Sequence, residues 1–206
     1  MPNKSELRKK FIASRKALTQ GQRDLYGSYI SDLFRTYFQE HPVKSVHLFL
    51  SIIRHHEIDT QGIIDFLRTQ GVDIIVSKSD FETTTLNHYL LDESTRIEEN
   101  GWGIPEPINA RPVTVDSIDL VLIPLVAFDF KGFRIGYGKG FYDKFLAKCN
   151  PRTIKIGLSF FPPIETIHPG SHDIPMDECI TPDRIYSFWK DAIHLKFATK
   201  SLILWY

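Results

Sequence analysis

The sequence has few cysteines: Cys149 and Cys179 are the two among 206 residues. Two thiols cannot build a disulfide framework, and no Cys/His cluster has the spacing of a zinc site. We therefore expect both cysteines to be reduced, as in a cytoplasmic protein. The start of the chain, residues 1–6, also lacks the apolar segment of a secretory signal.

An excess of charge of either sign is missing as well. Lys and Arg together number 25, and Asp and Glu together number 25, so no global field favours nucleic acid or a membrane surface. No apolar run approaches the ~18 residues of a membrane span. The hydrophobic content of 42% is typical of an ordered globular protein. We predict a single domain over residues 1–206, with residues 187–206 as a C-terminal extension of unknown role.

Helical and strand-like patterns alternate along the chain. Apolar residues at three- and four-residue spacing predict one helix over residues 4–18 and a second from a capping box at Thr19–Gln22 to Pro42. Further elements are predicted as strands at 45–51, 72–76, 86–91, 119–126 and 154–158, a short helix capped by Thr60, a helix from about Gly140 to Cys149, and a proline-rich loop at 101–107. This alternation predicts a three-layer α/β/α fold, an open, mostly parallel twisted sheet with helices on both faces. In such sheets ligands bind beyond the carboxyl ends of the strands.

The strongest functional signal lies in ten residues, from Arg134 to Asp143. They read Arg-Ile-Gly-Tyr-Gly-Lys-Gly-Phe-Tyr-Asp and follow the apolar run at 119–129. Three alternating glycines permit positive φ angles and leave backbone N–H groups open to a ligand. Arg134 and Lys139 add cations, and Asp143 adds a carboxylate. A strand, a cationic glycine turn and a helix start together predict a polyphosphate cradle.

This glycine loop matches neither common nucleotide-binding template. A dinucleotide fingerprint needs a glycine where Phe141 stands, and a Walker A loop needs Ser or Thr where Gly140 follows Lys139. A purely structural turn between strand and helix is the alternative interpretation. The two cations and the Tyr142–Asp143 pair favour ligand binding over that alternative.

Charged residues outside the loop extend the phosphate hypothesis. Lys4, Arg8 and Arg15 fall near one face of the first helix, where they could close over phosphates or form a solvated basic face. Asp143 and Asp173 together would suit Mg²⁺, which takes one or two protein carboxylates beside phosphates and water. An aspartate such as Asp173 is, taken alone, more often a turn residue.

Two further residues suit a polar, flat ligand. Glu57 follows the first predicted strand, where it could orient a polar ring, accept a proton, or simply belong to a surface loop. Trp102 lies near Glu106 in the proline-rich loop, an arrangement that suits a heterocycle. The alternative for Trp102 is a buried side chain that anchors its loop.

Taken in order, these motifs resemble the 5-formyltetrahydrofolate cyclo-ligase family, also called methenyltetrahydrofolate synthetase. The resemblance covers about residues 3–186. The matching segments are Lys4–Arg8 with Arg15, Glu57–Thr60, Gly103–Pro107, Asp119–Pro124 with Ala127–Asp129, Gly132–Asp143, and His172–Asp173 with Asp177. The segment from Arg134 to Asp143 is highly specific, and the others count through their order.

The resemblance implies an enzyme that uses ATP and Mg²⁺ to convert 5-formyltetrahydrofolate into 5,10-methenyltetrahydrofolate, ADP and phosphate. The formyl oxygen would attack the γ-phosphate, and N10 would then close the ring. Arg134, Lys139 and Glu57 would be catalytic. The implied ATP contacts are Lys4, Ser5, Glu6, Leu7, Arg8, Arg134, Ile135, Gly136, Tyr137, Gly138, Lys139, Gly140, Phe141 and Tyr142. The implied folate contacts are Leu50, Ile52, Glu57, Trp102, Tyr137, Gly138, Lys139, Gly140 and Phe141, and the implied Mg²⁺ ligands are Asp143 and Asp173.

The implied protein is a cytoplasmic monomer with a small-molecule substrate, with or without a polyglutamate tail, and with no nucleic-acid or membrane partner. Phe141 stands where the family often has tyrosine, so any hydroxyl role there is absent. Three alternatives stay open at this point. They are a non-catalytic nucleotide- or folate-binding regulator, a sugar-phosphate isomerase-like enzyme that needs no ATP, and an interaction module that uses the aromatic C-terminus.

Overall fold

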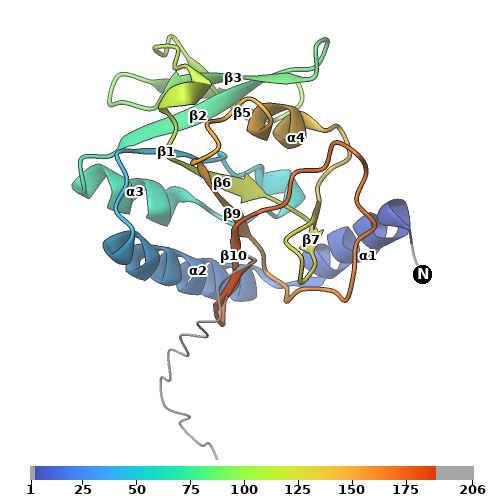
Figure 1. Ribbon diagram of the computed structural model, residues 1–206. Helices are drawn as coiled ribbons and strands as arrows, with labels where there is room; N and C mark the ends of the chain where they lie inside the picture. The colour runs from blue at the N-terminus through green and yellow to red at the C-terminus, as the bar shows by residue number, and fades with distance from the viewer. Residues whose placement is uncertain (1–2, 189–206) are drawn as a thin grey trace, which may run out of the picture.

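A seven-stranded sheet forms the centre of the computed structural model, which describes residues 3–188 (Figure 1). The strand order is β11-β10-β9-β6-β1-β2-β3. The strands are β1 Ser45–His47, β2 Asp73–Asp80, β3 Thr85–Leu90, β6 Leu120–Pro124, β9 Ile154–Leu158, β10 Glu178–Ile180 and β11 Ile185–Ser187. Pairing is parallel from β10 to β2 and antiparallel at the edges β3 and β11. The predicted mostly parallel sheet is confirmed.

Helices cover both faces of this sheet, with α2 and α3 on one side and α4 on the other (Figure 1). The helices are α1 Lys4–Ala17, α2 Gln20–Glu40, α3 Gln61–Thr69 and α4 Phe141–Leu146. In β6, Leu120 and Leu122 pack into the cluster of α2 and α3, while Val121 and Ile123 pack into the cluster of α4. Alternate residues of a strand face opposite sides, so a continuous apolar run is what a doubly covered strand needs.

The second and third helices begin differently. Thr19 and Gln22 form the predicted capping box of α2, with each side chain bonded to the other residue's backbone. At α3 the capping prediction is wrong. Thr60 does precede the helix, but its hydroxyl donates to the carbonyl of Phe49 and makes no cap bond. Thr60 therefore ties the segment after β1 to the start of α3.

Several predicted boundaries are also wrong. The first strand ends at His47 rather than at Ser51, although the N–H of Leu48 still donates to the carbonyl of Ile75. Part of the proline-rich segment is a strand, β5 (Pro105–Ile108), which pairs with β4 (Arg96–Glu99) in a separate two-stranded sheet. Proline is tolerated there because both strands are edges. The final helix, α4, is shorter than predicted, and the three-residue strands β10 and β11 were not predicted at all.

A small hairpin separates β6 from the glycine loop. It consists of β7 (Ala127–Phe128) and β8 (Arg134–Ile135), which pair in antiparallel fashion. Helix α1 packs on this hairpin, with Leu7 in one buried cluster with Ala127 and Ile135. The hairpin therefore fixes both the start of the glycine loop and its distance from α1.

The direction of the strand order changes between β1 and β6. From β1 the chain adds β2 and β3 on one side, while β6, β9 and β10 lie on the other. A crevice opens beyond the carboxyl ends of strands at such a switch point. Within residues 3–188, no helix has the length and apolarity to cross a membrane. The single domain over residues 1–206 stays a prediction, and residues 189–206 of the predicted extension lie outside the described part.

Candidate functional site

A cavity of about 470 Å³ lies at this switch point, within the size range of small-molecule sites. Its wall combines helix α1, the segment after β1, strand β2 and the glycine loop. All ten residues from Arg134 to Asp143 line it. So do the predicted contacts Lys4, Arg8, Leu50, Ile52, Glu57 and Asp173. The structure thus brings most of the predicted site together.

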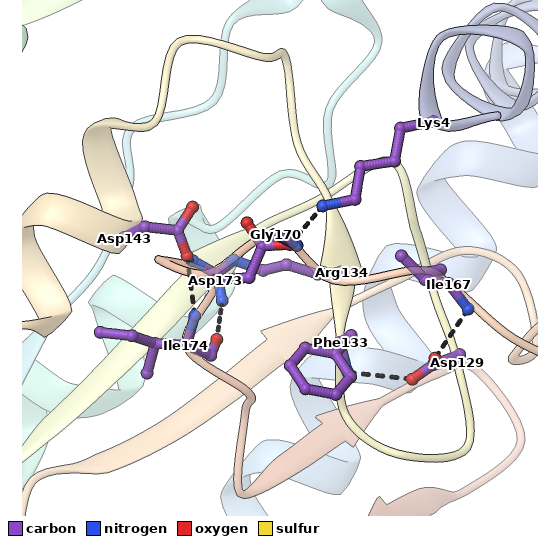
Figure 2. Close-up of polar contacts among 9 residues, drawn as sticks. All are labelled: Lys4, Asp129, Phe133, Arg134, Asp143, Ile167, Gly170, Asp173 and Ile174. Carbon is purple, nitrogen blue, oxygen red and sulfur yellow. Dashed lines mark hydrogen bonds and ion pairs between the residues drawn. The ribbon is translucent and has the colours of Figure 1, made fainter.

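At one end of the cavity, cations and carboxylates pair (Figure 2). Arg134, with a side chain only 6% exposed, donates to Asp143 at 2.7 Å and to the carbonyl of Ile174 at 2.5 Å. Lys4 reaches from α1 to form an ion pair with Asp173. Arg134 is thus a buried residue that holds Asp143 and the segment at Ile174 in place. The sequence did not indicate that this arginine is buried.

Each of these carboxylates keeps one oxygen free of hydrogen bonds to residues 3–188. The Oδ1 of Asp143 accepts from Arg134 and from the N–H of Ile174. The Oδ2 of Asp173 accepts from Lys4 and from the N–H of Gly170. Burial opposes ionisation of Asp173, but the hydrogen bonds from Lys4 and Gly170 outweigh it and lower the pKa of that carboxyl. Two carboxyl groups with one spare oxygen each fit the donor set that Mg²⁺ prefers.

A buried aspartate holds the hairpin beneath this end. Asp129 accepts from the N–H of Lys131 at 3.0 Å. It also accepts from the N–H groups of Phe133 and Ile167, both at 2.9 Å, and Figure 2 draws these two bonds. These bonds close the turn between β7 and β8 and tie it to the loop that leads to Asp173. Asp129 therefore helps to place Arg134 without lining the cavity.

The middle of the glycine loop lies against Arg8. The Nε of Arg8 donates to the carbonyl of Gly136 at 2.7 Å. Gly138 has φ +92°, and a Cβ there would lie 3.1 Å from the guanidinium carbon of Arg8. A Cβ at Gly136 would meet nothing within 4 Å. Gly138 is therefore needed both for its backbone conformation and for the approach of Arg8.

Lys139 differs from the other cations of the cavity. Its side chain is exposed, and among the described residues it has no hydrogen bond or ion pair, whereas Lys4, Arg8 and Arg134 are each engaged. A lysine ammonium is a mobile point charge with three donors. Lys139 is thus available to a phosphate group without breaking an internal contact.

At the other end, Glu57 is held by neutral donors. The hydroxyl of Tyr137 donates to Glu57 Oε1 at 2.7 Å, and the N–H of Ile52 donates to Oε2 at 2.9 Å. Arg15 donates to the oxygen of Tyr137 at 2.8 Å. Because arginine can only donate, the phenol hydrogen must point to Glu57. Burial raises the pKa of Glu57, and the bonds from Ile52 and Tyr137 and the charge of Arg15 offset this in part.

Arg15 does not lie over the phosphate end as its helical spacing suggested. It is 6% exposed, bonds to the carbonyl of Leu125 as well as to Tyr137, and does not line the main cavity. It shares a face with Lys4 and Arg8, but it lies nearer the end of α1, where that helix meets the sheet. Its role is to fix Tyr137.

Four predicted contacts do not line the cavity. Ser5 and Glu6 take part in the N-terminal cap of α1, and Leu7 is buried in the cluster beneath it. Trp102 is 67% exposed, with its ring 6.3 Å from that of Phe81. The alternative of a buried, anchoring Trp102 is therefore wrong.

Sequence reasoning missed several lining residues, among them Ser77, Ser79 and Phe81. The two serines alternate along the end of β2, beyond the last residue of β1, where one face of the strand is free to border the cavity. The polar run from Ser77 to Asp80, directly after the apolar stretch of β2, was the available signal.

The fold and cavity define an α/β protein with a ligand site at the topological switch point. The site suits a charged, phosphate-bearing ligand at one end and a hydrogen-bonding ligand at the other. No group of three or more His, Cys, Asp or Glu poised for a metal occurs between residues 3 and 188. The chain belongs to the 5-formyltetrahydrofolate cyclo-ligase family, whose model matches residues 1–182.

Known relatives agree with this assignment. The chain is 32% identical to the 5-formyltetrahydrofolate cyclo-ligase of Haemophilus influenzae, over 67% of this chain and 75% of the relative. It is 28% identical to that of Escherichia coli, over 84% and 97%. The solved structure of 5,10-methenyltetrahydrofolate synthetase from Aquifex aeolicus superposes with a TM-score of 0.74 at 25% identity, covering 95% of this chain and 99% of that one.

Proposed function

We propose that this chain converts 5-formyltetrahydrofolate into 5,10-methenyltetrahydrofolate, with conversion of ATP to ADP and phosphate. Family membership supports the reaction. The observation that carries the proposal is the shared cavity. Lys139, which has no hydrogen bond or ion pair within residues 3–188, lines the same cavity as Asp143, Asp173 and the hydrogen-bonded Glu57.

The phosphate groups of ATP would lie at the cationic end. Lys139 is free to bind them, and Arg8 lies beside the open backbone of Gly138. Phosphoryl transfer requires mainly positioning and neutralisation of charge, and these are what cations on a helix and a loop can supply. Arg134 would act largely by holding Asp143 rather than by moving to the phosphates.

Asp143 and Asp173 would hold Mg²⁺ through their spare oxygens. When bound, the ion would supply further charge neutralisation on the phosphates. Lys4 would assist from helix α1, because its hydrogen bond helps to lower the pKa of Asp173 and so favours the charged carboxylate.

The folate would occupy the end bounded by Glu57 and Tyr137. Glu57 is oriented through both its oxygens, so its charge can face a polar group of the substrate from a fixed direction. We propose that Glu57 orients the pterin or the formyl group, and we give it no role as a general base.

In the proposed chemistry, the formyl oxygen attacks the γ-phosphorus. An O–P bond forms, and the bond between the γ-phosphorus and the β-γ bridging oxygen breaks to release ADP. N10 then attacks the formyl carbon and gives up its proton to the departing phosphate or to water, and the carbon–oxygen bond breaks as phosphate leaves and the ring closes. The protein's own contribution is to hold the two ligands adjacent and to place Lys139 near the developing negative charge.

The finer assignments belong to the same proposal. We propose a monomer with one domain, acting in the cytoplasm on folate with or without a polyglutamate tail. Cys149 and Cys179 are both free thiols, which suits a reducing compartment.

The direct test is the absorbance of the methenyl product formed from 5-formyltetrahydrofolate by the purified chain. Product should accumulate with Mg·ATP and be absent when Mg·ATP is omitted, with one ADP released per product. Turnover without ATP would favour an isomerase-like reaction. Binding of both ligands without turnover would favour a regulator.

A further inference from the structure

Three polar side chains on adjacent strands form a hydrogen-bonded chain that the proposed reaction does not use. The Nε2 of His47, on β1, lies 2.6 Å from the hydroxyl of Ser77, on β2. That hydroxyl lies 3.0 Å from the Nδ1 of His88, its register partner on β3. The middle member of these three borders the cavity, because Ser77 is one of the residues that line it.

Folding alone does not account for this chain. His47 is fully buried and His88 is nearly so, and both rings pack against Phe145, with centroids 4.7 and 4.2 Å apart. The Nδ1 of His47 has no hydrogen-bond partner among the described residues. Burying an unpaired polar atom costs stability, and apolar side chains would fill the same space without that cost.

The valence of the serine hydroxyl determines what it can offer a ligand. A hydroxyl has one hydrogen and two lone pairs. When at least one of the two facing ring nitrogens carries a hydrogen, the imidazoles engage two of these three functions. One function remains for the cavity, and the two rings restrict its direction.

The Ser77 hydroxyl and the two imidazoles beside it are all uncharged at neutral pH. Burial, followed by the proximity of His88, lowers the pKa of His47 well below its usual range. Burial, followed by the charge of Lys148, lowers the pKa of His88 to about 4. A neutral hydroxyl between neutral rings suits a neutral polar edge rather than a phosphate. Leu86 and the ring of Phe141 line the same cavity, so its wall is partly apolar and suits a flat ring.

We propose that Ser77, positioned by His47 and His88, is a binding residue for the polar edge of a planar heterocycle in the cavity. This inference rests on the proposed function, since both of its ligands carry such a ring, the purine of ATP and the pterin of the folate. The shared chemistry is a ring with hydrogen-bonding groups on its rim, and binding measurements with each ligand alone distinguish the two.

The test is calorimetric titration of wild type, Ser77→Ala and Ser79→Ala. The two probes are 5-formyltetrahydrofolate alone and a non-hydrolysable ATP analogue with Mg²⁺. Ser79 is the matched control, because it lines the same cavity from the same strand but its hydroxyl has no imidazole partner. We expect Ser77→Ala to raise Kd for one ligand about tenfold, the size of one lost hydrogen bond. Ser79→Ala should change either Kd by less than about twofold.

Each outcome decides the inference. Weakening of one ligand by Ser77→Ala alone supports it and identifies the heterocycle. Unchanged affinity for both ligands overturns it, and so does equal weakening of both, which would show a structural role. If the alanine variant does not fold, Ser77→Cys keeps a side chain of similar size between the imidazoles and gives the same comparison. A wild type that binds neither probe overturns the proposed function itself.

Discussion

The two ends of the cavity hold their carboxylates in different ways. At one end Asp143 and Asp173 are in direct ion pairs with Arg134 and Lys4. At the other, Glu57 receives hydrogen bonds from a phenol and a backbone N–H, and the nearest cation acts through that phenol. The first arrangement lowers the pKa of Asp173, and the second leaves the pKa of Glu57 raised by burial.

This difference separates two tasks within one cavity. Carboxylates that have a cationic partner and one spare oxygen suit a site for phosphates and a divalent cation. A carboxylate held by neutral donors keeps its direction fixed and suits an uncharged, hydrogen-bonding ring. Substitutions at each end should therefore affect different ligands.

The largest effect is expected from Asp143→Asn. The amide still accepts from Arg134, so the fold should survive, but the charge that would bind Mg²⁺ is lost. We expect kcat to fall about 10³-fold, which corresponds to several kcal/mol of charge stabilisation. Turnover across a Mg²⁺ titration, beside a thermal unfolding curve, measures this. Near-normal turnover would remove Asp143 from the phosphate end.

Lys139→Ala should have the next largest effect. Removing the unengaged cation should lower kcat on the order of 10²-fold, as for loss of one donor to developing charge. Lys131→Ala is the control, because Lys131 is exposed in the β7–β8 turn and does not line the cavity. If kcat stayed constant and only KM for ATP doubled, Lys139 would act in binding alone.

Glu57→Gln should affect the folate end. We expect kcat/KM for the folate to fall about 10- to 100-fold, equivalent to a hydrogen bond to a charged group of ~1.5–3 kcal/mol. In the wild type, kcat/KM should fall as the pH drops through the pKa of Glu57, above its usual 4.5, because protonation removes the charge. The pH profile of the glutamine variant should lack that acid limb. An unchanged limb would assign it to another group.

Gly138→Ala should give the smallest of these effects. A left-handed conformation costs an alanine about 1–2 kcal/mol, and the new Cβ would press on Arg8. We expect KM for ATP to rise roughly five- to thirtyfold. Gly136→Ala, where the Cβ has open space, should stay near wild type. Equal effects of the two variants would show that loop flexibility, rather than the approach of Arg8, is what matters.

The periodicity of apolar residues predicted the layers of this fold but not how deeply individual side chains are buried. The spacing of Lys4, Arg8 and Arg15 correctly predicts a shared helix face, yet Arg15 is buried because α1 approaches the sheet near its end. The doubly buried β6 is evident from an unbroken apolar run. Three-residue strands such as β10 are too short to show a period.

Part of the site could likewise be predicted from the sequence and part could not. The glycine loop could be predicted, since its residues are contiguous and each has a distinctive chemistry. The pairing of Tyr137 with Glu57 joins residues 80 positions apart, and the bond between Ser77 and His88 depends on the register of two strands. The pattern of a single sequence shows neither which distant residues meet nor the register of two strands, so only the structure revealed these contacts.

The central claim is that the two ends of the cavity bind two different ligands. The most direct measurement is equilibrium titration of wild type, Lys139→Ala and Glu57→Gln with a Mg²⁺-bound, non-hydrolysable ATP analogue and, separately, with 5-formyltetrahydrofolate. We predict that Lys139→Ala weakens binding of the nucleotide alone and that Glu57→Gln weakens binding of the folate alone. Equal weakening of both ligands by each variant, or the reverse pattern, would contradict the account.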